Sequence, residues 1–149
     1  MVSEICQMDV QIKNVKTSIE KASVISIRRD VFIMGMNIPE ELEIDFNEDA
    51  AQYVLAYLGD TPVGTARWRE TEEGVKFERF AVLIGYRSLG IGRKMTEYIL
   101  NQIPSNVHIY LNSQDVAIGF YKKMGFEPVG PMFEEVGIPH QKMVYQRAE

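Results

Sequence analysis

A junction between an extended segment and a helical one, near the middle of the chain, constrains the fold most. Residues 75–83 are rich in aromatic and β-branched side chains, which favour a strand, and residues 90–103 carry apolar residues at helical spacing. The polar loop between them contains Gly85, Gly90 and Gly92. Glycines leave backbone N–H groups uncovered, and a helix start adds partial positive charge. The junction therefore predicts a phosphate- or pyrophosphate-binding loop at residues 87–92.

Two common phosphate-binding motifs do not fit this loop. A Walker A loop requires a lysine directly after its second glycine, where this chain has Ile91. The dinucleotide-binding fingerprint requires a third glycine at the position of Met95. Both motifs are therefore excluded, and the loop must hold its phosphate in another way.

The remaining pattern alternates strands with helices and predicts one α+β domain over residues 1–149, with a central mixed, mostly antiparallel sheet flanked by helices. Thr17 and Glu20 form a capping-box pattern at the start of the first helix, and Gly59-Asp60 marks a hairpin turn. The predicted helices cover residues 18–34, 90–103 and 117–124, with a short helix within 35–49. The predicted strands cover residues 10–15, 52–58, 63–69, 75–83, 107–111, 126–129 and 142–145.

Composition excludes several classes of partner. The formal net charge of −5 argues against non-specific nucleic-acid binding, which needs a basic surface. Apolar runs are much shorter than the roughly 18 residues of a membrane helix, and no signal peptide is evident. The single cysteine, Cys6, permits no internal disulfide. We expect a cytoplasmic protein without nucleic-acid or membrane partners, and without a metal, since no Cys/His spacing suits one.

Two segments together resemble a known family. Arg87-Ser88-Leu89-Gly90-Ile91-Gly92 resembles the Arg/Gln-x-x-Gly-x-Gly/Ala loop of the GNAT N-acetyltransferase superfamily, and residues 120–126 resemble its Phe-Tyr-x-x-x-Gly-Phe segment. The likeness covers roughly residues 10–147 and is strongest to a group of small bacterial proteins of poorly defined substrate. Ile84 stands where the family often has proline, and Gln114 stands where many members have a cofactor-contacting asparagine.

The resemblance implies acetyl-CoA as the donor and a primary amine, of a small molecule or a protein, as the acceptor. The loop would bind the coenzyme A pyrophosphate through its N–H groups, with Arg87 or Arg93 adding charge. The pantetheine arm would pair with the preceding strand, where an N–H near Val82 would polarise the thioester carbonyl. The implied cofactor-binding residues are Phe80, Ala81, Val82, Arg87, Ser88, Leu89, Gly90, Ile91, Gly92, Arg93, Asn112, Gln114 and Phe120.

Tyr121 is the general acid that the resemblance implies, because the family places a tyrosine of this segment near the coenzyme A sulfur. Its hydroxyl would protonate the leaving thiolate, and the ordinary pKa values of phenol and thiol differ by only about one to two units. The alternative is a core tyrosine on the apolar face of a helix.

Glu78 is the candidate general base, acting through water, because some members of the family carry a carboxylate on this strand. Strict alternation would place Glu78 with Phe80 and Val82 on one face, and residues 79 and 81 on the other. The alternative for Glu78 is an ion pair with Arg67 or Arg69. His140 competes for the role of base because its ordinary pKa suits proton transfer near neutrality.

Three questions stay open at this point. The acidic residues between Glu40 and Asp49 form either a cation-binding lip of the acceptor pocket or a solvated loop. The alternative function is a non-catalytic or regulatory coenzyme A-binding module. A homodimer is common among similar proteins, but this sequence does not determine the oligomeric state.

Overall fold

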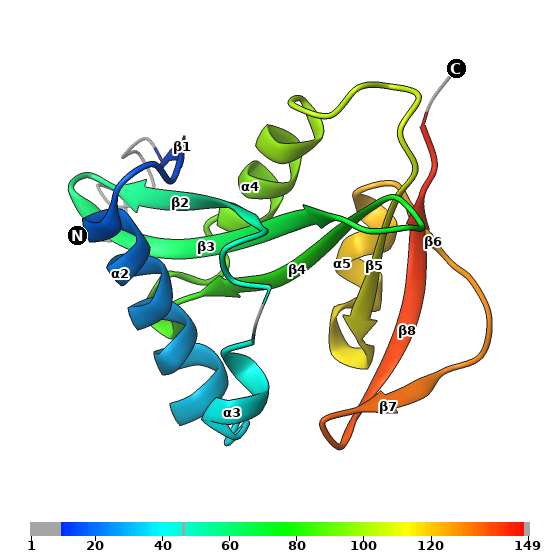
Figure 1. The fold of residues 1–149 in the computed structure, drawn as a ribbon, viewed down its shortest axis with the longest axis horizontal. Coiled ribbons are helices and arrows are strands. Elements are labelled where there is room, and N and C mark those ends of the chain that lie inside the picture. Colours follow the sequence, from blue (N-terminus) through cyan, green and yellow to red (C-terminus); the bar gives the residue numbers. More distant parts are fainter. Residues whose placement is uncertain (1–9, 46, 148–149) are drawn as a thin grey trace. The chain divides into compact units, whose positions relative to one another are not determined.

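The computed structural model describes residues 10–147 apart from residue 46 (Figure 1). Apart from one added strand, its elements follow one another in the order that the sequence pattern predicts. They are β1 (Val10–Asn14), α2 (Ser18–Arg28) with a π-helical continuation (Arg29–Met34), α3 (Glu40–Glu43), β2 (Gln52–Leu58), β3 (Thr61–Glu70), β4 (Val75–Val82), α4 (Ile91–Leu100), β5 (Ile109–Gln114), α5 (Ile118–Lys123), β6 (Phe126–Pro128), β7 (Phe133–Glu135) and β8 (Ile138–Tyr145).

Within the described residues, eight strands form one sheet in the order β1-β2-β3-β4-β5-β8-β6, and β7 also pairs with β8. The β1–β2, β5–β8, β6–β8 and β7–β8 pairs are antiparallel. The β4–β5 pair is parallel and runs from Val75↔Ile109 to Phe77↔Leu111. The predicted α+β fold with a mixed, mostly antiparallel sheet flanked by helices is therefore confirmed. That residues 1–149 form one cofactor-binding domain stays a prediction.

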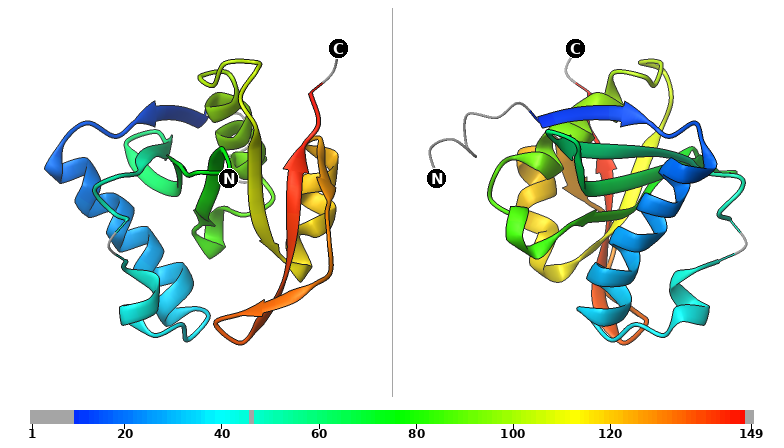
Figure 2. Two further views of the ribbon diagram at one scale, coloured as in Figure 1. Left: turned by 45° about the vertical axis from the view of Figure 1, so that its right-hand side comes forward. Right: turned by 90° about the vertical axis from the view of Figure 1, so that its left-hand side faces the viewer.

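The chain divides into two compact units. The first unit comprises the described parts of residues 1–67 together with residues 79–102. Its main core lies between α2 and the sheet and contains Val24, Ile27, Phe32, Tyr53, Leu55 and Ala81. On the opposite face of the sheet, the start of α4 packs closely against Gly64 of β3. A Cβ at Gly64 would lie only 3.1 Å from Ile91 Cγ2. Figure 2 shows α2 and α4 on either side of β2 and β3.

The second unit comprises residues 68–78 and the described parts of 103–149. Its core is aromatic and centres on Phe126, which is fully buried at the start of β6. The Phe126 ring contacts Phe77, Tyr121 and Tyr145 at centroid distances of 5.9, 5.8 and 5.1 Å. Gly125 precedes it with φ +102°, in the left-handed region, and ends the segment of α5 as predicted.

The first helix begins as predicted but buries a different face. The Thr17 hydroxyl accepts from the Glu20 N–H at 3.1 Å, and the Glu20 carboxylate accepts from the Thr17 N–H at 2.9 Å. The apolar spacing that predicts this helix starts at Ile19, which is 81% exposed. The buried residues of α2 are instead Val24, Ile27 and Arg28. A buried arginine belongs to no hydrophobic pattern, so spacing alone does not identify this face.

The C-terminal strands differ most from the sequence prediction. β8 begins four residues earlier than expected, and β7 is not predicted at all. β7 has three exposed residues, so it lacks the alternation of buried and exposed side chains that identifies a strand. The turn between them uses Val136 and Gly137, both with positive φ. No helix in the described ranges is long and apolar enough to cross a membrane.

Candidate functional site

The loop at residues 87–92 has the geometry of an anion-binding turn. Ser88 and Gly90 are both left-handed, with φ of +70° and +76°, so successive N–H groups turn toward one side. Gly90 is the N-cap of α4 and supplies no side-chain cap, so the first N–H groups of this helix have no side-chain partner there. A Cβ at Gly90 would meet nothing within 4 Å. The space beside Gly90 is therefore open, next to the uncapped start of α4.

Three cations surround this loop. Arg87, Arg93 and Lys94 are all exposed. Arg87 Nε donates to the Val82 carbonyl at 3.0 Å, and Arg93 pairs with Glu97 at 3.0 Å along α4. The positive charge favours a bound phosphate, and neither contact is buried. That Arg87 or Arg93 contacts a pyrophosphate stays a prediction, as does binding by Ser88, Leu89, Ile91 and Gly92.

The strand before the loop does not alternate as the sequence predicts. Arg79 lies within β4 but has φ +54°, in the left-handed region. Arg67 and Arg69 are two residues apart on β3, so their side chains share a face of that strand. Asp45 binds both Arg67 and Arg79, whereas Arg69 binds Glu78. Strict alternation is therefore interrupted at Arg79, and the predicted grouping of Glu78 with residues 80 and 82 stays a prediction.

Beyond this left-handed residue lie Phe80, Ala81 and Val82, the predicted contacts of the pantetheine arm. The β4–β5 ladder stops before them, at Phe77. Ala81 is buried in the core of the first unit, while Phe80 and Val82 are half-buried. The first unit therefore holds both this backbone stretch and the glycine loop.

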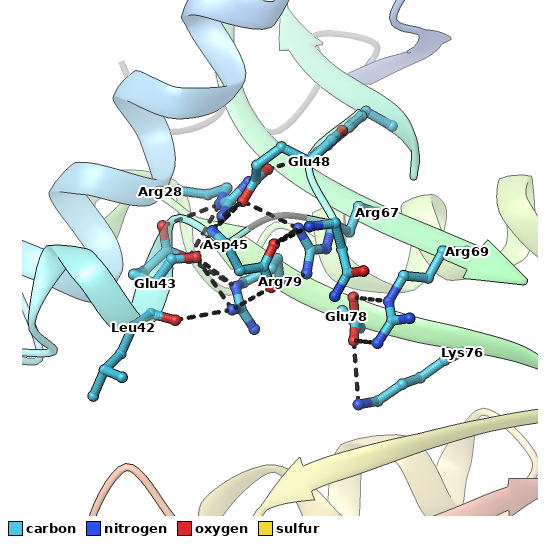
Figure 3. Close-up of polar contacts among 12 residues, drawn as sticks. Arg28, Leu42, Glu43, Asp45, Glu48, Arg67, Arg69, Lys76, Glu78 and Arg79 are labelled. Carbon is cyan, nitrogen blue, oxygen red and sulfur yellow. Dashed lines mark hydrogen bonds and ion pairs between the residues drawn. The ribbon is translucent and has the colours of Figure 1, made fainter. Parts of the chain in front are cut away.

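Glu78 belongs to the second unit and is held by two cations (Figure 3). Arg69 Nε and Nη2 donate to its two carboxylate oxygens at 3.0 and 3.1 Å. Lys76 Nζ lies 3.2 Å from the second of these oxygens, and only 7% of the Glu78 side chain is exposed. The ion pair that the sequence offered as an alternative is therefore formed with Arg69. The role of general base stays a prediction.

Tyr121 lies within the aromatic core of the second unit. Its ring meets Phe120 and Phe126 edge-on, at centroid distances of 5.0 and 5.8 Å. Burial raises the pKa of Tyr121 well above its ordinary value, so the hydroxyl keeps its proton at neutral pH. The same shift widens the gap to a thiol beyond the one to two units expected from ordinary values. Proton donation by Tyr121 stays a prediction, and so does a cofactor contact of Phe120.

The remaining predicted residues meet across the β5–β8 pair of the second unit. Asn112 lies opposite Lys142, and Gln114 lies opposite His140. His140 is buried, with Nδ1 2.7 Å from the Ile138 carbonyl and Nε2 3.6 Å from a Glu135 carboxylate oxygen. The short contact to a carbonyl indicates that Nδ1 carries a proton, which leaves Nε2 to accept one in the neutral ring. Cofactor binding by Asn112 and Gln114, and catalysis by His140, stay predictions.

The acidic segment between Glu40 and Asp49 turns half of its carboxylates toward buried arginines (Figure 3). Arg28, fully buried, donates from Nε to both Glu43 oxygens at 3.2 and 3.1 Å, and from Nη1 and Nη2 to Glu48 at 2.6 and 2.8 Å. Arg67, also fully buried, donates twice to Asp45, at 3.0 and 2.8 Å. These three carboxylates are occupied within the fold, so they cannot also serve as a cation-binding lip.

Only the exposed acidic residues of this segment remain candidates for a cation-binding lip of the acceptor pocket. Glu40 and Glu41 line a pocket of about 390 Å³ together with Ile25, Arg29 and Ile44. Glu40 also pairs with Arg29 at 2.6 Å, with both side chains about half exposed. No group of three or more His, Cys, Asp or Glu residues in the described ranges is arranged to hold a metal. The expectation of a metal-free site stays a prediction.

The buried arginines are the residues that sequence reasoning missed. Arg67 stands inside an apolar strand and Arg28 inside a predicted helix, and six acidic residues follow Arg28 within twenty positions. A lone charge inside an otherwise apolar element is rarely fully buried unless it is paired. A charged residue inside an apolar element therefore predicts a buried ion pair. It does not identify the carboxylate partner, because that depends on the tertiary structure.

The network makes the stability of the protein depend on pH. Burial alone would raise the pKa of Glu48, but hydrogen bonds from Arg28, Tyr53 and the Asp45 N–H outweigh it and lower the pKa well below 4.5. A lowered folded pKa contributes stability above the unfolded value and loses it as the pH falls. We expect the free energy of unfolding to fall between about pH 5 and pH 3, with a shallower slope for Glu48→Gln. Urea denaturation at each pH measures both slopes, and equal slopes would contradict this role of Glu48.

A family model agrees with this arrangement over most of the chain. Residues 15–147 match the model described as an acetyltransferase (GNAT) domain. The match includes the glycine loop, the β4 strand and α5.

Related proteins extend the comparison. The uncharacterized N-acetyltransferase YjcF of Bacillus subtilis is 35% identical over 121 residues, which cover 79% of this chain and 86% of YjcF. The crystal structure of Escherichia coli ElaA superposes with a TM-score of 0.83 at 22% identity, over 93% of this chain and all of ElaA. An acyl-CoA N-acyltransferase from Pseudomonas aeruginosa gives a TM-score of 0.81 at 21% identity, over 94% and 100% of the two chains.

Proposed function

This chain belongs to the acetyltransferase (GNAT) family, and we propose that it moves the acetyl group of acetyl-CoA directly to a primary amine. Acetyl transfer is the activity that the descriptions of the family model and of the relative YjcF name. The acceptor is a small molecule or a protein side chain. Nothing in the fold or in these relatives favours the non-catalytic alternative.

The glycine loop carries this proposal. Ser88 and Gly90 are left-handed, the start of α4 has no side-chain cap, and the space beside Gly90 is open. A helix N-terminus with free N–H groups stabilises a phosphate, and the nearby Arg87 and Arg93 add charge at the surface. We propose that the coenzyme A pyrophosphate binds here and that the pantetheine arm continues along residues 80–82.

We assign the proton transfers to Tyr121 and Glu78. The amine must lose a proton before it attacks the thioester, and Glu78 accepts it through water. Its two cationic partners, Arg69 and Lys76, support this role by holding the carboxylate in one orientation. Tyr121 then protonates the leaving thiolate, and its raised pKa supports this role because the hydroxyl carries a proton at neutral pH.

Calorimetry with acetyl-CoA, followed by thiol detection across a panel of amines, tests the reaction. We expect acetyl-CoA to bind and at least one amine to release free coenzyme A. No binding near millimolar acetyl-CoA would end both the catalytic proposal and its non-catalytic alternative. Tight binding without turnover on a broad panel, with protein substrates included, would favour a regulatory coenzyme A-binding module.

Tyr121→Phe tests the proton donor. Phenylalanine keeps the ring that packs against Phe120 and Phe126, so we expect the variant to fold and to bind acetyl-CoA as the wild type does. Turnover should fall by about 10²- to 10⁴-fold, the usual contribution of a general acid. Single-turnover measurements keep product release from masking the chemical step. Unchanged single-turnover rates would remove Tyr121 from this role.

We propose a cytoplasmic protein that acts without nucleic acid, from its single cysteine and its net charge of −5. A homodimer stays a proposal that sedimentation would test.

A further inference from the structure

Arg79 adopts a backbone conformation that its residue type disfavours. Its φ of +54° lies in the left-handed region, inside the strand β4. This conformation is unfavourable for a residue with a Cβ, whereas glycine adopts it freely. Such a conformation persists in a non-glycine residue only when the surrounding structure enforces it. The side chain of Arg79 shows what enforces it here.

The guanidinium of Arg79 is held by the segment around α3. Nε lies 2.9 Å from Glu43 Oε2, and Nη2 lies 3.3 Å from Asp45 Oδ2. Both nitrogens also donate to the Glu43 carbonyl, at 3.3 and 3.1 Å. Nη2 donates to the Leu42 carbonyl as well, at 3.4 Å. Figure 3 shows these partners converging on the guanidinium from one side.

The partners of Arg79 are themselves fixed. The Glu43 side chain is only 2% exposed and forms an ion pair with the buried Arg28, while Asp45 forms one with the buried Arg67. Removing Arg79 therefore leaves both carboxylates paired with an arginine. Glu43 and Asp45 should therefore stay in place when Arg79 is substituted. A substitution at Arg79 then tests the contacts of Arg79 itself.

The residues that follow Arg79 are those along which the donor is proposed to lie. Phe80, Ala81 and Val82 come directly after it, beyond the end of the β4–β5 ladder at Phe77. The φ angle of Arg79 sets the direction in which their N–H and carbonyl groups point. If Arg79 relaxed to an extended conformation, these groups would rotate away from the positions that they occupy.

We propose that Arg79 is a positioning residue for the donor: its ion pairs with Glu43 and Asp45 hold the left-handed turn that orients residues 80–82 for the pantetheine arm. This inference rests on the proposed function. It ties the segment around α3 to the strand that binds the donor, and it assigns Arg79 a role in acetyl-CoA affinity without contact to the acetyl group.

Two substitutions at one position separate this role from a general structural one. Arg79→Ala removes the ion pairs and keeps a Cβ, whereas Arg79→Gly removes the same ion pairs but adopts positive φ without cost. We expect calorimetry to show acetyl-CoA binding weakened about 5- to 10-fold in the alanine variant and within about 2-fold of the wild type in the glycine variant. The KM for acetyl-CoA should follow the same order.

Arg29→Ala is the matched control, since it removes an exposed arginine–glutamate pair at the same segment and should leave acetyl-CoA affinity unchanged. If Arg79→Ala does not fold, Asp45→Asn takes its place. It should weaken binding, and adding Arg79→Gly to it should restore binding. Equal affinity of the alanine and glycine variants, or no rescue in the double variant, would overturn the inference. A wild type that does not bind acetyl-CoA would instead overturn the proposed function.

Discussion

Replacing Gly90 with glutamate is expected to abolish acetyl-CoA binding while leaving the protein folded. A side chain at this position meets no atom within 4 Å, so it projects into the space that we assign to the pyrophosphate. The carboxylate would fill that space and would repel the phosphates. The only cost to the folded state would be a non-glycine residue at φ +76°, about 1–2 kcal/mol. Calorimetry should show at least about a 100-fold loss of affinity, which corresponds to roughly 2.7 kcal/mol.

Gly85→Glu is the control for the added charge. Gly85 lies in the preceding turn and is exposed, and a Cβ at this position would also meet nothing within 4 Å, but its φ is not positive. We expect Gly85→Glu to bind acetyl-CoA within a few-fold of the wild type. If Gly90→Glu binds as well as Gly85→Glu, the pyrophosphate does not lie at the start of α4. Thermal melting of both variants would confirm that each is folded.

The sequence predicted the elements of this fold well because local signals agreed with the tertiary structure. The capping box at Thr17, the hairpin turn at Gly59-Asp60 and the glycine loop all depend on residues close together in the chain. β2 was predicted with both of its ends correct, since it is bounded by turn residues and its interior is apolar. The glycine loop at residues 87–92 belongs to the same class of feature, and its binding of the donor stays a prediction.

The parts that the sequence did not predict depend on contacts distant in the chain. The left-handed Arg79 breaks the alternation of β4, and nothing near it in sequence marks the break, because its anchors lie more than thirty positions earlier. The contacts of the acidic segment between Glu40 and Asp49 also depend on residues distant in the chain. Its charge pattern was compatible with a solvated loop or a cation-binding lip. In the structure, three of its carboxylates form ion pairs with arginines of α2, β3 and β4.

The same network contains both the buried Arg28 and Arg79, the residue that we propose orients residues 80–82 for the donor. Three arginines and three carboxylates balance one another, so the cluster stays buried without a net charge. Arg28 is its most buried member and binds Glu43 and Glu48 rather than the glycine loop or residues 80–82. A change at Arg28 should therefore act mainly on folding, whereas a change at Arg79 should act mainly on donor affinity.

Replacing Arg28 with alanine is expected to destabilise the protein by about 3–5 kcal/mol, the usual cost of breaking a buried ion pair from one side. Glu43, 2% exposed, would keep only Arg79, and Glu48 would lose two hydrogen bonds. For a chain of this length, the loss corresponds to a fall in melting temperature of roughly 2–4 °C per kcal/mol. Urea denaturation with a fixed slope measures it directly.

Arg29 provides a control at the adjacent position, because it also pairs with a glutamate of α3 but does so at the surface, with 48% of its side chain exposed. Exposed pairs contribute only about 0–1 kcal/mol, so Arg29→Ala should unfold at nearly the same urea concentration as the wild type. The two variants remove the same side chain from neighbouring positions of one helical segment, and burial is the main difference between them. If Arg28→Ala cost less than about 1 kcal/mol, like a surface pair, the buried network would not be what holds the acidic segment against α2, β3 and β4.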